Sequence, residues 1–345
     1  MRPTAPATPD STSPADLQID PRLDPQVQQL LATILLPRRP PFDTTVLRSG
    51  HLALQPVLDG EPVAVESVDG FTVAPDPGRG TPRLAVRRYQ PRRGCTRGIV
   101  WLHGGGWVVG TLDGYDSSAR ALAAASDSQV FVVDYRLAPE SPYPAALADC
   151  TAAFEYIAAN AGLFGVDPAR LVLGGDSAGG LLGIGVSRWL AGAQMPERAA
   201  PAGPRPAALV LVYPVTDARM QHGSYRRFAD GYHLSAAQMA WFWDQFAPPG
   251  LARGNEALSL EHPDLSPLLA EDLGNLPPTL VITAECDVLH DEGLAFANAL
   301  NLAGVEHEYL EVPAMIHGFM RFRAAVRQAR ELPAQITEQL DRWQI

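Results

Sequence analysis

The sequence predicts an α/β fold in which a mostly parallel sheet is covered by helices on both faces. Three observations predict it: short uninterrupted apolar runs recur along the chain, segments with helical spacing separate most of them, and two runs end in glycine-rich turns. Strands that are apolar throughout are typical of parallel sheets buried on both faces. A chain of 345 residues, 46% of them hydrophobic, can bury one large core of this kind.

The expected elements can be placed along the chain from these patterns. An N-terminal helix is expected at 27–36, where apolar residues recur at helical spacing. A second helix is expected at 145–160, and a glycine-rich one follows Ser177. Strands are expected around 63–65, 84–86, 98–102, 130–133, 171–173, 207–213, 279–284 and 306–312. Because helices separate most of these strands, neighbouring strands should run parallel.

A serine between two glycines follows one of the apolar runs, where residues 175–179 read Gly-Asp-Ser-Ala-Gly. A strand ending here and a helix beginning here must turn so sharply that side chains at 175 and 179 would collide. Such a turn, a nucleophile elbow, would expose the hydroxyl of Ser177 above the sheet. The alternative is an ordinary glycine-rich turn. Asp176 is interpreted as an anchor of the turn rather than as a catalytic group.

A second glycine-rich turn, His-Gly-Gly-Gly at 103–106, follows an earlier apolar run. Backbone N–H groups can approach the oxyanion of an acyl-transfer transition state only where no side chain obstructs them. Gly104 and Gly105 are therefore predicted donors of an oxyanion hole, with Ala178, at the start of the helix after the elbow, as a third. The alternatives are a flexible loop or a phosphate loop, but a phosphate loop needs Gly-Lys and this chain has no lysine.

An acid and a base follow later in the chain, each just after an expected strand. They are Asp287 and His317, and the order serine, aspartate, histidine is known from catalytic triads on α/β sheets. Asp291 and Glu292 are rival acids, but they begin a helix, where acids are common as N-terminal charges. His103 could be mistaken for the base, yet its place before the glycines suits a loop-shaping hydrogen bond.

Together these motifs resemble the bacterial branch of the hormone-sensitive-lipase family of α/β-hydrolases. Members carry a His-Gly-Gly-Gly loop, a Gly-Asp-Ser-Ala-Gly-Gly elbow and an Asp-x-Leu-x-Asp-Glu-Gly segment, which this sequence has at 103–106, 175–180 and 287–293. His290 departs from the family, which usually has arginine or another residue there. The resemblance implies an α/β-hydrolase fold with a helical cap. It also implies roles for six residues: Ser177 as nucleophile, Asp287 as acid, His317 as base, and Gly104, Gly105 and Ala178 as oxyanion donors.

The implied cap would be assembled over the serine from two stretches that lie outside the regular alternation. Residues 1–50 would form an N-terminal arm and part of the cap, 51–212 the first part of the catalytic domain, 213–262 the cap insertion, and 263–345 the second part of the catalytic domain. The insertion is rich in aromatic residues: Tyr232, Trp241, Phe242, Trp243 and Phe246. Such a cluster suits an acyl or alcohol pocket, or it forms the core of the cap itself.

The expected activity is that of a serine carboxylesterase, which would hydrolyse short- to medium-chain esters through an acyl-enzyme. The chain-length expectation rests on the family resemblance. One alternative is hydrolysis of another acyl bond, an amide, carbamate or lactone, which uses the same groups. Another is a non-catalytic ligand receptor, such as the plant gibberellin receptors on the same architecture, although all three triad residues are present here.

The amino-acid composition excludes some classes of partner and favours one cellular location. The net charge of −11 argues against a nucleic-acid partner, and no apolar run approaches the length of a membrane span. Three cysteines, and an N-terminus without the apolar region of a secretory signal, favour the cytoplasm. No cluster has the spacing of a zinc site, so neither a metal nor an organic cofactor is expected. The expected partner is a small-molecule ester, and a homodimer is left open.

Overall fold

One sheet of eight strands organises the residues that the structure, a computed structural model, describes: 19–35, 38–74, 80–192, 204–253 and 256–345. The strand order is β1-β2-β4-β3-β5-β6-β9-β10. The pairs β1–β2 and β2–β4 are antiparallel, whereas every further neighbour from β4 to β10 is parallel. The mostly parallel sheet expected from the sequence is confirmed.

The bounds of the elements are as follows. The strands of the sheet are β1 (Ser67–Val73), β2 (Leu84–Gln90), β3 (Arg97–Leu102), β4 (Ser128–Asp134), β5 (Leu171–Asp176), β6 (Leu209–Val212), β9 (Thr279–Cys286) and β10 (His307–Ile316), and β7 (Ala252–Arg253) pairs with β8 (Glu256–Ala257) in a separate hairpin. The helices are α1 (Pro25–Thr33), α2 (Thr44–Asp59), α3 (Asp116–Ser126), α4 (Ala145–Ala159), α5 (Ala161–Phe164), α6 (Ala178–Leu190), α7 (Ser224–Arg227), α8 (Ala236–Phe246), α9 (His290–Leu302) and α10 (Arg327–Arg342). Short 3-10 turns are η3 (Asp113–Tyr115), η4 (Pro168–Arg170), η5 (Pro267–Leu269), η6 (Leu273–Asn275) and η7 (Phe319–Arg321).

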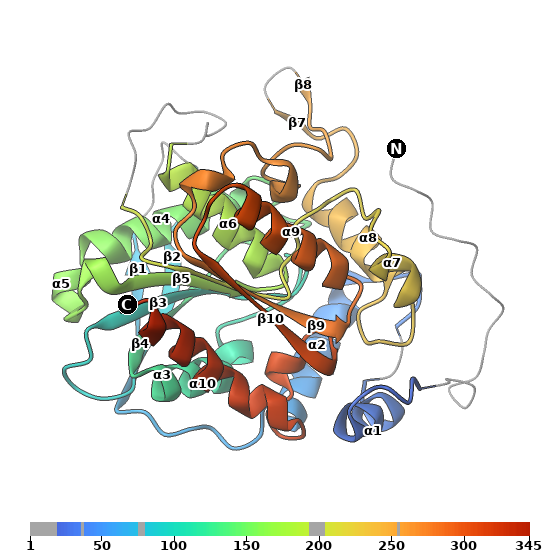
Figure 1. The fold of residues 1–345 in the computed structure, drawn as a ribbon, viewed down its shortest axis with the longest axis horizontal. Helices are drawn as coiled ribbons and strands as arrows, with labels where there is room; N and C mark the ends of the chain where they lie inside the picture. The colour runs from blue at the N-terminus through green and yellow to red at the C-terminus, as the bar shows by residue number, and fades with distance from the viewer. Residues whose placement is uncertain (1–18, 36–37, 75–79, 193–203, 254–255) are drawn as a thin grey trace.

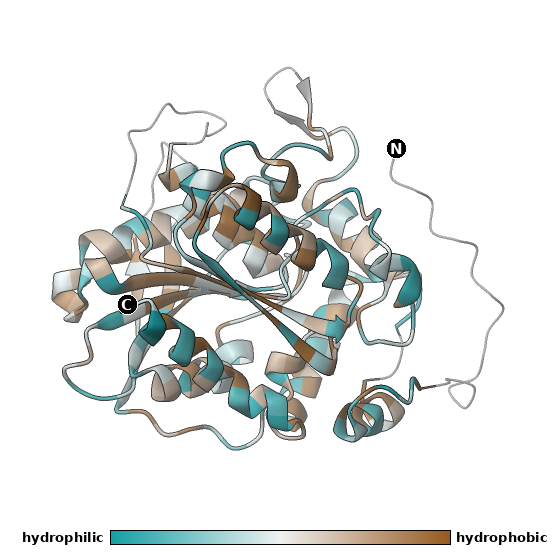
Figure 2. Cartoon of the chain, in the orientation of Figure 1, coloured by the Kyte–Doolittle hydropathy of each residue, from teal (hydrophilic) through white to brown (hydrophobic). Residues whose placement is uncertain are grey.

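The sheet is the middle of three layers. Helices α3 and α10 cover one face, and α4, α6 and α9 cover the other (Figure 1). Strands β3, β5 and β6 are buried along their whole length, and Figure 2 shows hydrophobic strands at the centre of the molecule. This double burial explains why their sequences are apolar without alternation.

Two sequence expectations differ from the structure at the start of the chain. The strand expected around 63–65 was wrong, because β1 begins only at Ser67. As an edge strand, β1 is largely solvent-exposed, so its sequence carries little apolar signal. Helix α2 was not anticipated either, because Pro56 interrupts its pattern and exposed apolar residues such as Val46 and Val57 blur its spacing.

Helices from two distant parts of the sequence, α1 and α2 from the N-terminal arm and α7 and α8 from the insertion, gather at one end of the sheet (Figure 1). Their segments touch. The ring centroids of Phe42 and Trp241 are 5.9 Å apart, and the Tyr232 hydroxyl donates to Asp20 at 2.9 Å. Helices α2 and α8 line a pocket that also contains residues following β5 and β10.

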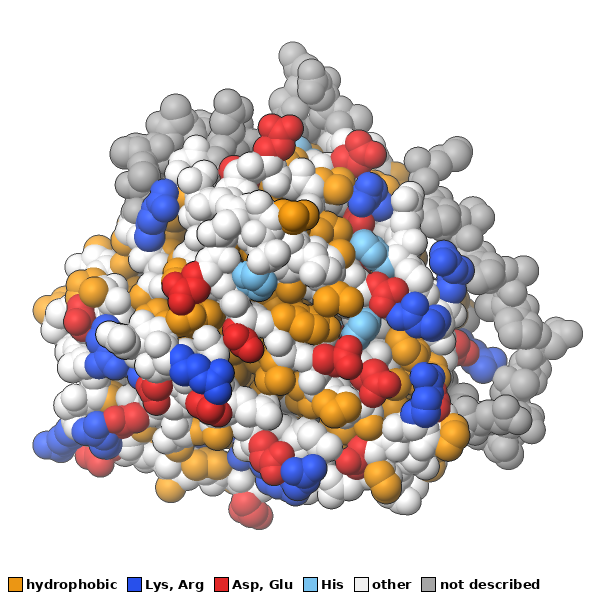
Figure 3. Space-filling model, in the orientation of Figure 1, with side chains coloured by type: hydrophobic (Ala, Val, Ile, Leu, Met, Phe, Trp, Pro, Cys, Tyr) orange, Lys and Arg blue, Asp and Glu red, His pale blue; other side chains and the backbone are white. Residues whose placement is uncertain are grey.

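The surface carries both signs of charge. Figure 3 shows acidic and basic side chains interspersed over one face, with hydrophobic side chains between them. Among the described residues, no helix combines the length and the apolar character needed to cross a membrane.

Candidate active site

Ser177 occupies the turn between β5 and α6 in a conformation that few residues adopt. Its φ is 55° and its ψ −119°, and strain of this kind is typical of functional turns. A Cβ on Gly175 would overlap the backbone of Gly179, and a Cβ on Gly179 would overlap the carbonyl of Leu102. The steric reason inferred from the sequence for these two glycines is therefore confirmed.

Ser177, His317 and Asp287 form one chain of hydrogen bonds. The Ser177 Oγ lies 2.9 Å from His317 Nε2, and His317 Nδ1 lies 2.7 Å from Asp287 Oδ2. Since the carboxylate accepts the Nδ1 proton, Nε2 is left to accept the serine proton. All three residues are buried, with 6%, 8% and 1% of their surfaces exposed, so few water molecules compete for these bonds.

The sheet brings these three residues together although they are far apart in sequence. Asp287 directly follows β9, and His317 directly follows β10. Strands β6, β9 and β10 continue the parallel sheet beyond β5, so all three side chains emerge at the carboxyl ends of parallel strands. The backbone N–H of Leu289 donates to the second carboxylate oxygen of Asp287 at 3.0 Å, which holds the carboxylate in place.

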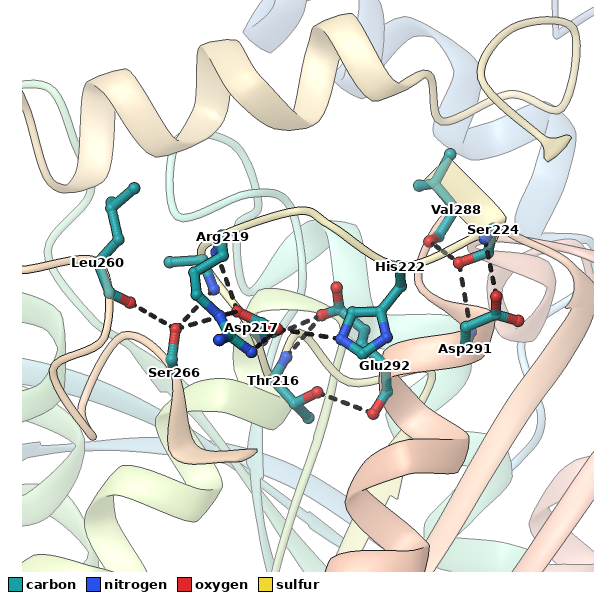
Figure 4. A network of polar contacts seen from close by, with 11 residues as sticks. Thr216, Asp217, Arg219, His222, Ser224, Leu260, Ser266, Val288, Asp291 and Glu292 are labelled. Carbon is teal, nitrogen blue, oxygen red and sulfur yellow. Dashed lines mark hydrogen bonds and ion pairs between the residues drawn. The ribbon is translucent and has the colours of Figure 1, made fainter. Parts of the chain in front are cut away.

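The rival acids Asp291 and Glu292 are occupied elsewhere, in a network of polar contacts shown in Figure 4. The carboxylate of Asp291 accepts from the backbone N–H of Ser224 at 2.8 Å, and buried Glu292 accepts from that of Thr216 at 2.7 Å. The Ser224 hydroxyl also donates to the carbonyl of Val288 at 2.6 Å. These bonds tie the loop that carries Asp287 to segment 216–224.

The glycine loop differs from the expectation at one position. The N–H of Gly104 donates to the Tyr115 hydroxyl at 2.8 Å and to Asp176 Oδ1 at 3.1 Å, so it is not available to an oxyanion. Gly105 and Gly106 line the pocket beside Ser177, whereas Gly104 does not. Among the described residues, no backbone acceptor takes the N–H of Gly105 or Gly106. The prediction of Gly104 as a donor was wrong, because the turn directs its N–H into the protein.

Asp176 and His103 both support the glycine loop through contacts with Gly104. Asp176 accepts from the Trp101 ring N–H at 3.2 Å and from the Tyr115 hydroxyl at 2.9 Å, which confirms its interpretation as an anchor. Burial raises the pKa of Asp176. His103 is completely buried and its ring stacks on Tyr135, with centroids 4.2 Å apart. Burial lowers the pKa of His103 to about 4, so its ring is neutral near pH 7.

The aromatic residues of the insertion divide between pocket and core. Phe242 lines the pocket. Trp243 and Phe246 instead pack on Trp107, with ring centroids 4.6 and 4.2 Å away. Two of the five, Trp243 and Phe246, therefore pack around the glycine loop, Trp241 packs on Phe42 and Tyr232 on Phe228, and among the five only Phe242 lines this pocket.

Four basic side chains in the pocket were missed by the sequence analysis: Arg38, His51, His233 and Arg321. Arg38 comes from the N-terminal arm, His51 from α2, His233 from the insertion, and Arg321 from the turn after His317. No local motif marks them, because they meet only when the arm folds over the sheet.

All three cysteines, Cys95, Cys150 and Cys286, are unpaired and buried. Burial raises the pKa of the Cys286 thiol to about 12, which makes it a poor nucleophile beside Asp287. The described part of the chain holds no group of three or more metal-ligating side chains.

The fold and the hydrogen-bonded serine, histidine and aspartate define the class of serine hydrolases built on an α/β sheet. A family model described as the alpha/beta hydrolase fold matches residues 99–321, and the chain belongs to this family.

Curated relatives and solved structures agree with this assignment. The chain is 36% identical to an ethyl acetate hydrolase of Pseudomonas putida, over 74% of this chain and 78% of the relative. It is 35% identical to the carboxylic ester hydrolase LipN of Mycobacterium tuberculosis, over 86% and 77% of the two chains. An esterase from the archaeon Pyrobaculum calidifontis has a TM-score of 0.79 at 34% identity, covering 92% of this chain and 97% of its own.

Proposed function

We propose that this protein is a serine carboxylesterase that hydrolyses short- to medium-chain acyl esters. The continuous hydrogen-bonded chain from Ser177 through His317 to Asp287 carries the proposal. The names of its relatives, which include an ethyl acetate hydrolase and carboxylic ester hydrolases, support an ester as substrate. The match to ethyl acetate hydrolase supports the short end of the range.

Acylation begins when the Ser177 Oγ attacks the ester carbonyl carbon. His317 Nε2 takes the serine proton, and the Asp287 carboxylate stabilises the imidazolium that forms. The tetrahedral intermediate then collapses, the bond from carbon to the alkoxy oxygen breaks, and His317 returns the proton to the departing alcohol.

Deacylation repeats these steps with water as the nucleophile. His317 takes a proton from water, the hydroxide attacks the acyl-enzyme, and the proton passes to the Ser177 Oγ as the carboxylic acid leaves. The net reaction consumes one ester and one water and yields one acid and one alcohol. No step requires a group beyond the three side chains and the oxyanion donors.

The oxyanion donors in this proposal are the N–H groups of Gly105, Gly106 and Ala178. Gly105 and Gly106 line the pocket beside Ser177, and Ala178 is the first residue of α6, where N–H groups have no partner within the helix. The positive end of the helix dipole adds to the stabilisation. One such donor typically contributes about 3–4 kcal/mol to the transition state.

The decisive experiment compares the wild-type protein with Ser177→Ala on p-nitrophenyl esters from acetate to palmitate. We expect rapid turnover of the shorter esters and none by the variant. Turnover that survives the substitution would overturn the assignment of the nucleophile. A folded wild-type protein without esterase activity would instead direct the search to amides, carbamates or lactones.

We also infer a cap built from residues 1–50 and 213–262 over the two-part catalytic domain of 51–212 and 263–345. The ring contact between Phe42 and Trp241 and the ion pair between Arg39 and Asp230 support this division, since they join the two stretches. Residues 1–18 lie outside the described residues. Deletion of residues 1–42 should lower activity on all esters without abolishing the fold of the sheet.

The proposal also covers the cellular location of the protein and its oligomeric state. Three buried, unpaired cysteines support a cytoplasmic location, where thiols stay reduced. Cell fractionation tests this. A homodimer is proposed as the assembly, and light scattering after size exclusion gives its mass directly. Nucleic acid is not an expected partner of a chain with net charge −11.

A further inference from the structure

We propose that the pocket of this esterase selects esters that carry a second, negatively charged carboxylate group, which Arg38 and Arg321 bind. This inference rests on the proposed function, because it names the substrate class of the same site. Both arginines line the pocket that contains Ser177 and His317. The reaction at the ester bond is unchanged, and the second carboxylate takes no part in it.

The guanidinium of Arg321 lies at the pocket wall, and not all of its N–H groups have hydrogen-bond partners in the described chain. Its Nη1 lies 2.9 Å from His51 Nε2, and its Nη2 lies 3.4 Å from the carbonyl of Gly114. Its carbon centre lies 5.1 Å from the centroid of the Tyr115 ring. The Nε of Arg321 is buried and has no hydrogen-bond partner within the described chain. A buried donor without a partner is unfavourable unless a ligand satisfies it.

Arg38 adds a second positive charge from the N-terminal arm. It is half-buried, and it forms no ion pair with any residue that the structure describes. Removal from water lowers the pKa of its guanidinium. Its neighbour Arg39 differs, because Arg39 pairs with Asp230 at the surface.

The other titratable groups of the pocket leave this positive charge uncompensated. Burial and the nearby arginines lower the pKa of His51 well below its usual range, and that of His233 to about 3, so both rings are neutral near pH 7. Neutral His51 is the acceptor that the contact with Arg321 requires.

Two carboxyl groups also feel the charge of Arg321, but neither forms an ion pair with it in the described residues. Asp176 is engaged by Tyr115, Trp101 and the glycine loop. Burial raises the pKa of Asp59 to about 6, so it is mostly ionised near pH 7, but it does not line the pocket. The pocket thus concentrates positive charge in a protein whose net charge is −11.

A carboxylate is the ligand group that suits this arrangement. Guanidinium N–H groups bind carboxylate oxygens by strong, charge-assisted hydrogen bonds, and a ligand carboxylate would neutralise charge that the protein leaves unpaired. The carboxylate could belong to the acyl part or to the alcohol part of the ester. Both sources share the same recognition chemistry, so the experiment has one arm for each.

The test compares anionic esters with neutral esters of the same shape at pH 8, where carboxylates are ionised. The first arm uses monomethyl esters of the four- to six-carbon dicarboxylic acids against the corresponding methyl ester amides. The second arm uses 4-acetoxybutanoate against 4-acetoxybutanamide. We expect kcat/KM for the anionic member to exceed that of its amide by about tenfold or more in at least one arm. Ratios at or below one in both arms would overturn the inference.

Variants show whether the two arginines are responsible. Arg38→Gln should reduce the ratio by about tenfold, and Arg321→Gln should do so too. Arg39→Gln is the matched control, since it removes an adjacent surface charge outside the pocket and should leave the ratio unchanged. An equal loss of ratio in Arg39→Gln, or no loss in Arg38→Gln, would contradict the proposal. Arg38→Gln is the more direct variant, because Arg321 also supports Tyr115.

A binding measurement separates this inference from the proposed function. Adipate and adipamide are titrated calorimetrically into the wild-type protein and into Arg38→Gln. Adipate should bind the wild-type protein about tenfold more tightly than the variant, with no such preference for adipamide. If no ester is hydrolysed but adipate still binds through Arg38, the esterase proposal fails and the anion site stands. If neutral esters are hydrolysed but adipate shows no preference, the anion site alone fails.

Discussion

The Nε2 of His317 lies 2.9 Å from the Oγ of Ser177, although 140 positions separate the two residues in the sequence. The contact exists because β5 and β10 deliver both residues to the same edge of one sheet, with β6 and β9 between them. A base at hydrogen-bonding distance is what turns a weakly nucleophilic hydroxyl into an attacking group.

The first prediction separates Asp287 from its rivals. Asp287→Asn should lower kcat by about 10⁴-fold, because an amide cannot hold His317 in the tautomer that accepts the serine proton. Asp291→Asn removes a carboxylate of the same loop, which contacts Ser224 and Arg227 instead. Its kcat should change far less. Steady-state kinetics on p-nitrophenyl butyrate compare the two, and a larger loss in Asp291→Asn would assign the acid differently.

The second prediction concerns the hydroxyl of Tyr115, which bridges the N–H of Gly104 and the carboxylate of Asp176. Tyr115→Phe should lower kcat by up to about 10²-fold with little change in KM, because the glycine loop loses a support. The free energy of unfolding should fall by about 1–2 kcal/mol. Tyr156→Phe is the matched control, since the Tyr156 ring packs on Phe71, and Tyr156 is not among the residues lining the pocket. Similar kcat values for the two variants would show that the loop does not depend on this bridge.

The third prediction tests the closeness of the elbow to β3. Gly179→Ala should destabilise the fold by about 3 kcal/mol or more, because the added methyl would overlap the backbone of Leu102 and neither element can retreat. Gly162→Ala, in α5, meets open space and should be neutral or stabilise the fold by up to about 1 kcal/mol. Urea unfolding curves measure both changes. Equal stability of the two variants would mean that the elbow can relax.

The fourth prediction is a loss of stability in mild acid from His103. Its pKa of about 4 in the folded protein lies below the value of about 6.5 in an unfolded chain, so between these values only the unfolded chain binds the proton. Stability should therefore fall as the pH drops from about 6.5 to 4, by up to about 1.4 kcal/mol per pH unit for this residue. Urea unfolding at several pH values gives the slope, and His103→Gln should make it shallower. If His103→Gln leaves the slope unchanged, His103 binds its proton equally in the folded and unfolded states.

The positions of the motifs were predictable because each depends on local geometry. A serine between Gly175 and Gly179 indicates the sharp turn at the end of β5, and the apolar runs indicate strands that are buried on both faces. Asp287 and His317 could be placed as candidates because each lies shortly after an expected strand. The exposed strand β1 was misplaced for the opposite reason, since an edge strand needs no apolar sequence.

The direction of a single N–H group could not be predicted in the same way. Gly104 and Gly106 are equivalent in sequence, but the N–H of Gly104 meets Asp176 and Tyr115, while Gly106 lines the pocket. Backbone direction within a glycine-rich turn depends on the partners around it, because glycine itself imposes little preference.

The sequence by itself determined the α/β sheet and the elbow at Ser177, and it supplied the candidate acid and base, because residue spacing and steric demands within a few positions encode them. Only the tertiary structure decided which glycines and which charged side chains line the pocket. Arg38 lies on the arm, His51 on α2 and Arg321 on the turn after His317, and the contact of His51 with Arg321 spans 270 positions. No periodic pattern in the sequence predicts such a contact, because the contact depends on how the N-terminal segment packs over the sheet.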